Sequence, residues 1–562
     1  MKYIFLFSFF ALILASLATW YSTPELQSEV PVIYWVTDNN PARKEQIEIF
    51  HRWLKKHGHP EMELRLDVAN RDVSKMIIQG VSGVGGDVMD IGSGSGLRYF
   101  QAVGLLKDVT DWGRELGFDP GRTYAAMEPE ITLDGHQYMF PCNVYLHLYW
   151  VNRATFRQYG QPQPPERWDF AEFERRGKAF VKAANPPDRH RTVFFANQIP
   201  TTVMHRSVGL SVFDEALTRC ALDDPRYAEV LQRKRKWTYE DRILPSRADI
   251  ESFATESGYG GSTLQLFNSG NYAMFLMGRY ALIQLREFGN LELTVSHPPY
   301  GEFPNTSIGT RAAAIYTGSP HQQLAKYFLT FLASEDYNMQ IVRDADALPP
   351  NPRYTETTAF EYPLPLLPAN LEQIMGYREE EMEEFYDFKI RFYEALDEAD
   401  RDKPLDLKTL PNPPSPAHLS GAEYQEKLAA FHRAYTSMLP TYRNEWGCHE
   451  IFVEAAETIA IGGSYSPFVL PSTVSRISTE VEDGFMAGIY SAEEAARTVA
   501  ARINGEIQRT LEENPRLKPL YEEYRKDQEE IDRLRQRGEP VPRRLIRNPF
   551  HRRYFAFKGW IK

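Results

Sequence analysis

Cysteine is scarce in this chain of 562 residues. Only Cys142, Cys220 and Cys448 occur, and an odd number excludes a fully paired disulfide framework. They are also too widely spaced to form a zinc knuckle. One bridge at most can form, and three free, buried thiols are the simplest expectation.

Several catalytic and nucleotide-binding motifs are absent. His449-Glu450 is not followed by a second histidine one helical turn later, so the zinc-protease pattern fails. The glycine-serine run at residues 92–96 has glycine at its centre, unlike a nucleophile elbow, and it lacks the spacing of a dinucleotide or P-loop motif. We therefore predict no catalytic residue, cofactor or metal. Paired glycosidase carboxylates stay open, because only their separation in space would identify them.

Positive charge is also in deficit, with 64 Lys and Arg against 76 Asp and Glu and a formal net charge of -12. This balance argues against a nucleic-acid partner, which would require a basic face. With 43% hydrophobic and 25% charged residues the chain is globular, and its length predicts two or more lobes. Aromatic residues make up 13% of the chain, an excess that a core or a ligand site has to accommodate.

The one long hydrophobic run is at the N-terminus. Lys2 precedes an apolar stretch over residues 3–14, and Ser16 and Ala18 fit a signal-peptidase site. The run is close to the roughly 18 residues that can span a bilayer. Residues 1–22 are therefore a cleaved signal peptide or a retained anchor. Both predict a periplasmic or extracytoplasmic protein, and the second adds attachment to the inner membrane.

The chain that follows alternates strands and helices. Residues 30–36 read as an apolar strand, residues 40–58 as a helix, and residues 61–68 as a half-buried strand with period 2. A further helix leads to a buried strand that runs into the glycine-serine loop. This order predicts an α/β fold, with ligands bound where the strands' carboxyl ends open a crevice.

Residues 143–151 form a strand with two different faces. Val144 and Leu146 fall on an apolar face, whereas Asn143 and Tyr145 fall on a polar and aromatic face. Rings with hydrogen-bonding tips suit sugars, which offer C–H faces for stacking and hydroxyl edges. The alternative is a strand buried on both faces. Just upstream, Asp134-Gly135 predicts a hairpin turn.

Five blocks in fixed order resemble a known family. They are "YWVTDNNPARKEQIEIFHRWLKKHG", "GGDVMDIGSGSGLRYFQAVGLLKDVTDW", "DGHQYMFPCNVYLHLYWVNRATF", "FNSGNYAMFLMGRY" and "SIGTRAAAIYTGSPHQQLAKYFLTFLASE". Together they resemble the extracellular solute-binding proteins of ABC transporters, family 1, the maltose-binding-protein-like group that binds sugars. The resemblance covers most of residues 30–350 and again about 464–507.

The resemblance implies a two-lobed periplasmic-binding-protein fold of type II-like organisation, with a hinge between the lobes. It places lobe 1 at residues 30–140 and 285–345, and lobe 2 at residues 141–284 and 445–507. A helical insertion at 351–444 and a charged helix with a basic aromatic tail at 508–562 lie outside it. The implied function is that of a receptor delivering a sugar, oligosaccharide or sugar derivative to the permease subunits of an ABC importer.

The resemblance also implies a set of ligand-binding residues: Trp35, Asp38, Asn39, Ser93, Ser95, Asn143, Tyr145, Arg279, Tyr280, Thr310 and Arg311. Arg279-Tyr280 stands where the family usually has tryptophan, and Arg311 where small or aromatic residues are common. Two guanidinium groups would suit a carboxylated or phosphorylated sugar. Either arginine could equally be a structural ion-pair partner.

Two other functions stay open: a periplasmic carbohydrate-active lyase or hydrolase, and a membrane-tethered envelope scaffold or sensor. The tail could contact an anionic membrane surface, dock on a transporter subunit, or pack back on the acidic body. Packing or docking is favoured, because the tail lacks a clear amphipathic period.

Overall fold

The computed structural model describes residues 30–356 and 448–562, apart from residues 41, 188–191, 254–260 and 289–290. The predicted leader at residues 1–22 and all but the first few residues of the predicted insertion at 351–444 lie outside the described residues. Among the described residues, no helix has both the length and the apolar character needed to cross a membrane.

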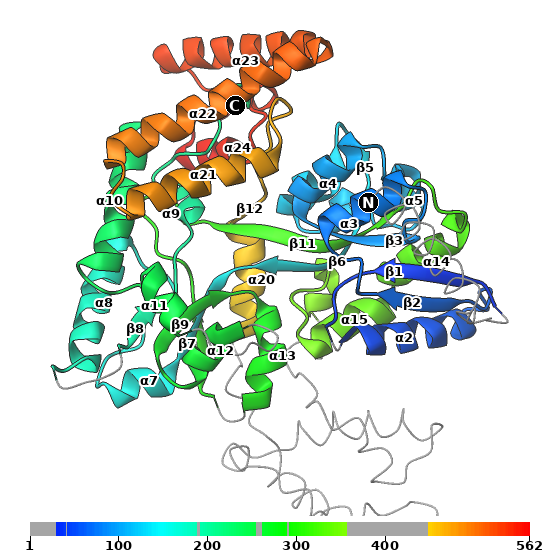
Figure 1. Cartoon of the computed structure of the whole chain (residues 1–562), viewed down its shortest axis with the longest axis horizontal. Helices are drawn as coiled ribbons and strands as arrows, with labels where there is room; N and C mark the ends of the chain where they lie inside the picture. Colours follow the sequence, from blue (N-terminus) through cyan, green and yellow to red (C-terminus); the bar gives the residue numbers. More distant parts are fainter. Residues whose placement is uncertain (1–29, 41, 188–191, 254–260, 289–290, 357–447) are drawn as a thin grey trace, which may run out of the picture.

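The first lobe is an α/β unit built on a mixed sheet (Figure 1). Strands β1 (Val32–Val36), β2 (Glu63–Asp67) and β3 (Val88–Gly92) are parallel, in the order β3-β1-β2. The helices of this lobe include α2 (Ala42–Lys56), α3 (Val73–Val81), α4 (Ser93–Ala102), α5 (Thr110–Glu115), α6 (Glu128–Ile131), α14 (Gln322–Leu332) and α15 (Glu335–Asp344). Trp35, Phe50, Trp53 and Phe328 lie in the core between sheet and helices. The predicted succession of strand, helix and strand is confirmed.

One long strand, β11 (Thr306–Ile315), extends this sheet toward the second lobe. It pairs antiparallel with β3 and with β6 (Met139–Leu146), and parallel with the short β12 (Ala460–Ile461). A register shift between Arg311 and Ala312 lies opposite Cys142, beside Pro141. Proline has no N–H to donate and is tolerated at such an irregularity on an edge strand. The predicted turn at Asp134-Gly135 joins β4 (Thr132–Leu133) to β5 (His136–Gln137), with both turn residues at positive φ.

The second lobe contains a separate four-stranded sheet in the order β10-β7-β9-β8. Its strands are β7 (Leu148–Asn152), β8 (Phe194–Ala196), β9 (Tyr272–Met277) and β10 (Leu293–Ser296). Its helices include α7 (Arg153–Gln158), α8 (Phe170–Ala184), α9 (Thr201–Ser207), α10 (Pro225–Tyr239), α11 (Arg247–Ser252), α12 (Gly261–Asn268) and α13 (Leu282–Leu285). Its core is largely aromatic, and the ring of Phe173 contacts those of both Phe195 and Trp237. Much of the aromatic excess is therefore core.

The strands locate the points at which the chain changes lobe. Strand β6 pairs with β11 as far as Leu146, so the chain leaves the first sheet at His147, later than the predicted boundary at residue 141. Strand β10 still pairs in the second sheet, so the return follows Ser296, later than residue 285. The third crossing is α20 (Cys448–Thr458) with β12, which joins the first sheet.

The C-terminal region packs on the body of the protein. Helices α21 (Pro471–Met486) and α22 (Ala492–Glu513) form a pair against α10, and α23 (Lys518–Gln536) lies beside α22 at the top of Figure 1. The basic tail forms α24 (Pro549–Lys558), whose Phe550 and Phe555 are buried with Phe303 and Ile461. All three cysteines are buried thiols, as expected.

A buried network of charges, centred on Asp346, ties the loop after α15 to the first lobe. The Arg43 guanidinium donates to Asp38 at 2.9 Å and to Asp346 at 2.8 Å. The Arg311 guanidinium donates to Asp90 at 2.5 Å and lies 3.7 Å from Asp346. Burial alone would raise the pKa of Asp346, but Arg43 and Arg311 hold it below the usual value. Asp346 is therefore ionised and shared between two cations.

We expect Asp346→Asn to lower the free energy of unfolding by about 3–5 kcal/mol, because removing one partner leaves buried charges uncompensated. The folded-state pKa of Asp346 is depressed, so its contribution is present at neutral pH and is lost as the pH falls below the ordinary carboxyl range. Urea unfolding at several pH values should show a shallower acid dependence in the variant than in the wild type. Equal loss of stability at every pH would contradict this assignment.

The packed tail gives a second prediction. Phe550 is fully buried, whereas Phe557 on the same helix is 55% exposed. Phe550→Ala should lower the free energy of unfolding by about 3–5 kcal/mol, since it removes a ring and leaves a cavity. Phe557→Ala is the matched control and should cost much less. Equal, small effects in chemical denaturation would mean that the tail is not part of the folded body.

Candidate ligand-binding cleft

The predicted ligand-binding residues separate into two groups. One lies in or against the charged network of the first lobe: Trp35, Asp38, Asn143, Thr310 and Arg311. The other lies where the chain crosses between the lobes and consists of Tyr145 and Tyr280, while Ser93 and Ser95 lie at the start of α4 with their hydroxyls 2.8 Å apart. Arg279 belongs to neither group, and Asn39 is exposed in the loop after β1.

The first group is engaged in internal contacts. Trp35 is fully buried and donates from Nε1 to Asp90 at 2.7 Å. Asn143 donates to Asp346 at 3.2 Å and accepts from the backbone N–H of Arg311 at 3.1 Å. Thr310 is fully buried, and its hydroxyl donates to the carbonyl of Asn143 at 2.6 Å. These side chains stabilise the edge of the first lobe and present few free polar atoms to a ligand.

Arg279 is buried between the second lobe, the segment around α15 and the start of α20, contrary to its predicted position facing the cleft. Its side chain is fully buried and donates from Nε to His449 at 2.7 Å, and from its two terminal nitrogens to the carbonyls of Ala347 and Val342 at 2.7 and 2.9 Å. A guanidinium group has five N–H donors in a fixed fork, and here the fork joins three protein segments. Arg311 is likewise paired within the protein, with Asp90. Both arginines that were predicted to bind an acidic sugar therefore stabilise the fold instead.

The second group forms an aromatic corner at the crossing strand, which we define as Tyr145, His147 and Tyr280. The ring of Tyr145 stacks on His147 at 5.6 Å and meets Tyr280 edge-on at 6.2 Å. The three side chains are half-buried rather than enclosed. Burial, followed by the nearby charge of Glu130 and by Tyr280, raises the pKa of Tyr145 to about 12, so its hydroxyl keeps its proton. Of the polar and aromatic face predicted for the strand over residues 143–151, Tyr145 and His147 are half-buried at the crossing, whereas Asn143 bonds to Asp346 and Tyr149 is buried in the second lobe.

Glu130 on α6 connects this corner to the start of α4. Its carboxylate accepts from the backbone N–H of Gly94 at 2.6 Å, from that of Gly463 at 2.6 Å, and from the hydroxyl of Tyr465 at 3.0 Å. The N-terminus of a helix favours an anion, and the anion at the start of α4 is the protein's own carboxylate. Gly94 permits the approach, because a Cβ there would lie 2.4 Å from the carbonyl of Pro129.

Two arginines flank the Glu130 and Tyr465 pair. The Arg98 guanidinium lies 4.3 Å from the centre of the Tyr465 ring and donates to the carbonyls of Gly94 and Pro129 at 2.9 and 3.0 Å. Arg206 on α9 of the second lobe donates to Gly462 at 3.1 Å, and its Nε has no hydrogen-bond partner among the described residues. Burial lowers the pKa of Arg206 to about 10. Both side chains therefore retain cationic character beside the interlobe contact.

A cavity of about 1160 Å³ opens beside Arg98 and Tyr465. Residues of the first lobe, including Glu128, Pro129 and Asp134, form one wall, and the segment after β12 with the C-terminal helices forms the other. The volume slightly exceeds the range of typical small-molecule sites, so an oligosaccharide or a substituted sugar would fit. Further arginines line it: Arg543, Arg547, Arg552 and Arg553. The cavity is thus polar, aromatic and basic in the same place.

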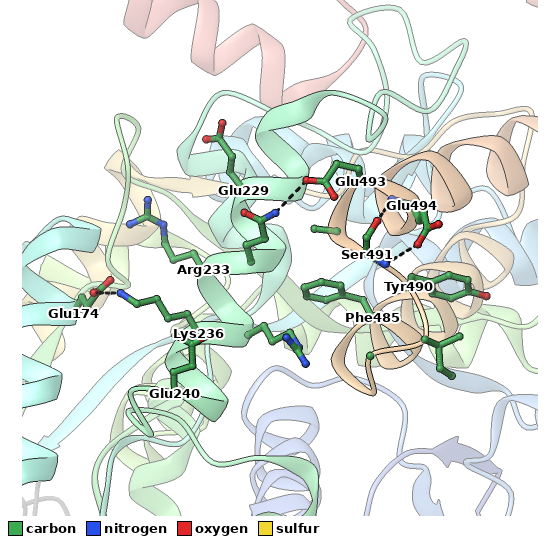
Figure 2. A pocket seen from close by; sticks show the side chains of 15 residues that line it. Glu174, Glu229, Arg233, Lys236, Glu240, Phe485, Tyr490, Ser491, Glu493 and Glu494 are labelled. Atoms are coloured by element: carbon green, nitrogen blue, oxygen red, sulfur yellow. Dashed lines mark hydrogen bonds and ion pairs between the residues drawn. The ribbon is translucent and has the colours of Figure 1, made fainter.

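A second groove, of about 990 Å³, lies on the outer side of the second lobe between α10 and the turn from α21 to α22 (Figure 2). Its charged side chains largely serve one another. Lys236 contacts Glu174, Gln232 donates to Glu493 at 3.2 Å, and Ser491 and Glu494 form the capping box of α22. These contacts explain the groove as a solvated junction between helices.

The sequence did not indicate Glu130, Tyr465, Arg98 or Arg206. Glu130 and Arg98 lie in ordinary helical sequence, and their contacts are with residues far along the chain. The only available signal was the small-residue segment "GGSYSP" at residues 462–467, whose glycines let the backbone approach Glu130 and the adjacent proline.

The family described as bacterial extracellular solute-binding protein matches residues 67–339 of this chain. A comparison with curated proteins finds no match. Among solved structures, an ABC substrate-binding protein from Listeria monocytogenes in complex with cycloalternan has a TM-score of 0.56 at 16% identity, covering 85% of this chain and 100% of that chain. A solute-binding protein from Thermotoga lettingae bound with α-D-tagatose has a TM-score of 0.56 at 14% identity, with the same coverage.

UgpB from Mycobacterium tuberculosis in complex with glycerophosphocholine has a TM-score of 0.55 at 13% identity, covering 86% of this chain and 100% of that chain. At these identities the structural likeness establishes the fold, which is the predicted two-lobed one with additional C-terminal helices. Residues 67–339 thus match the family of bacterial extracellular solute-binding proteins, and the fold of the chain is similar to that of these solved binding proteins.

Proposed function

We propose that this protein is the substrate-binding receptor of an ABC importer, and that it captures a sugar, oligosaccharide or sugar derivative between its two lobes. The observation that carries the proposal is the position of Tyr465. It lines the 1160 Å³ cavity and also touches Glu130, whose charge reaches Tyr145 in the aromatic corner. A ligand in the cavity would bridge the first lobe and the C-terminal region, which packs on α10 of the second lobe, and so favour their closer approach.

The work of such a receptor is recognition rather than bond chemistry. Glu130, the carboxylate whose charge reaches Tyr145, already accepts from two backbone N–H groups and a tyrosine hydroxyl, so it is poorly placed as a general acid or base. We therefore propose a non-enzymatic protein that works outside the cytoplasm with permease subunits of the transporter. The predicted leader at residues 1–22 supports this location.

The ligand class follows from the cavity arginines. Arg98, Arg552 and Arg553 direct their hydrogen bonds to backbone carbonyls, including those of Pro129, Ile546 and Ala460. A carbonyl does not neutralise a guanidinium, and burial lowers the pKa of all three arginines. Their charge is therefore available to an anion, and a phosphate or carboxylate substituent on the sugar would supply it. Acid recognition is thus proposed for these arginines in place of Arg279 and Arg311.

Loss of the aromatic corner should weaken ligand binding. Tyr145→Ala and Tyr280→Ala each remove a half-buried ring from the interlobe face, and each should reduce saccharide affinity about tenfold or more. Tyr239→Ala, at an exposed ring on α10, is the matched control. A thermal-shift screen over neutral, acidic and phosphorylated saccharides identifies the ligand, and calorimetry then measures affinity. No shift with any saccharide, or equal affinity in all three variants, would contradict the proposal.

The basic wall gives a separate prediction about selectivity. Arg552→Gln combined with Arg553→Gln should weaken binding of a phosphorylated or carboxylated sugar about tenfold, while affinity for its neutral parent stays unchanged. Arg544, which is exposed and does not line the cavity, provides the control Arg544→Gln. The extra affinity of the charged sugar over its neutral parent should also fall as the salt concentration is raised. Equal losses for charged and neutral ligands would point to a structural effect.

A further inference from the structure

Three potential metal ligands from distant parts of the chain meet beside the second lobe. Glu166 lies in the loop before α8, His297 directly follows β10, and Glu454 lies on α20. One ligand atom of each lies within 4.8 Å of the other two. This cluster shares no residue with the aromatic corner or with the lining of the cavity.

His297 is the most unusual member of this cluster. It is 1% exposed, yet neither ring nitrogen has a hydrogen-bond partner among the described residues. Its Nε2 lies 3.5 Å from Oε2 of Glu454, an oxygen that also has no hydrogen-bond partner in the described part of the chain. Buried polar groups are normally paired, and leaving one unpaired costs about 1–3 kcal/mol. Something that accepts electron pairs from both atoms would remove this cost.

The position of His297 is fixed by its backbone. Its N–H donates to the carbonyl of Glu166 at 2.8 Å, and its carbonyl accepts from Nε1 of Trp168 at 2.7 Å. These bonds fix the main chain of His297 next to Glu166, whichever rotamers the side chains adopt. The ring is thus presented to the cluster by the main chain, which is the arrangement expected of a preorganised ligand.

We propose that Glu166, His297 and Glu454 bind a divalent transition-metal ion of the zinc type, with water completing the coordination. One imidazole and two carboxylates form a donor set that suits Zn²⁺, which accepts nitrogen and oxygen ligands in tetrahedral geometry. Zinc–ligand bonds of 2.0–2.1 Å place neighbouring ligand atoms about 3.3 Å apart. The side chains of Glu166 and Glu454 are 52% and 34% exposed, so they have room to close on the ion.

Arg167 is the competing cation at this site. Its guanidinium contacts Oε1 of Glu454, and its Nε lies 3.8 Å from Oε1 of Glu166. It is 48% exposed and can turn toward solvent when an ion arrives. It reaches only the carboxylates and leaves both ring nitrogens of His297 unpaired. Arg167 therefore tunes the affinity of the site, and its removal should strengthen metal binding.

A bound ion would join segments that the sequence separates widely. Glu454 lies on the first helix after residue 447, whereas Glu166 and His297 belong to the second lobe. The ion would fasten α20 to that lobe through coordinate bonds and stabilise the folded chain by its binding free energy.

The test uses the full-length chain without a histidine tag, freed of metal with a chelator. Titration with Zn²⁺ by calorimetry, and with Co²⁺ by visible absorption, should show one saturable equivalent with the spectrum of a four- or five-coordinate site. Zn²⁺ should raise Tm. Glu166→Gln, at an exposed residue, should weaken binding about tenfold or more and leave the metal-free Tm unchanged. His297→Gln should abolish binding, and Arg167→Gln should tighten it.

His136→Gln is the matched control, because His136 also lies beside a carboxylate, Asp108 at 2.7 Å, but belongs to no cluster of three ligands among the described residues. It should bind metal as the wild type does. Absence of saturable binding in both the wild type and Arg167→Gln would overturn the proposal. Unchanged affinity in Glu166→Gln would do the same, since this variant should fold normally, and the cluster would then be an ion pair with Arg167.

Discussion

The pairing of β11 is the constraint on which the rest of the molecule depends. This one strand carries partners from three separate parts of the chain: β3 of the first lobe, β6 at the first crossing, and β12 at the third. Because a shift of one residue would turn every side chain to the opposite face, the register fixes all three at once. It sets Ser307 beside Ile461, and so determines where the segment that carries Gly463 and Tyr465 begins. The register of β11 therefore determines which main-chain segments meet at the interlobe site, and the side chains of those segments then form the site.

Charge is divided between two roles that the sequence alone does not distinguish. Arg43 and Arg311 are paired with carboxylates and hold the first lobe together. Arg98, Arg552 and Arg553 bond to neutral carbonyls and keep their charge for the cavity. The chain has a net charge of -12, so an exposed arginine would usually pair with a carboxylate. A basic cavity therefore requires that its arginines be bonded to neutral groups instead. The kind of acceptor, more than the count of arginines, indicates where an anion would bind.

The parts of the fold that could be predicted depend on local pattern. The turn at Asp134-Gly135 and the helix around 170–184 follow from turn chemistry and periodicity, and they agree with the structure. The single two-faced strand predicted over residues 143–151 is wrong, because β6 ends at Leu146 in the first sheet and β7 begins at Leu148 in the second, where it is buried on both faces. The site was harder to predict, because its contacts join residues hundreds of positions apart. Glu130 meets Gly463 across 333 positions, and Arg279 meets His449 across 170. A family pattern placed Arg279 on the cleft, whereas its burial was decided by the distant helix α20.

Helix α20 links the two sites that the structure suggests. Glu454 on its outer side belongs to the proposed metal cluster, and the chain leaves the helix directly into β12 and the Gly463 to Tyr465 segment. Its core side packs Phe452 against Trp150 at the start of the second lobe, with ring centres 5.3 Å apart. Because β12 pairs with β11 in the first sheet, an α20 fastened to the second lobe by the ion would tie the two sheets together just before the Gly463 to Tyr465 segment.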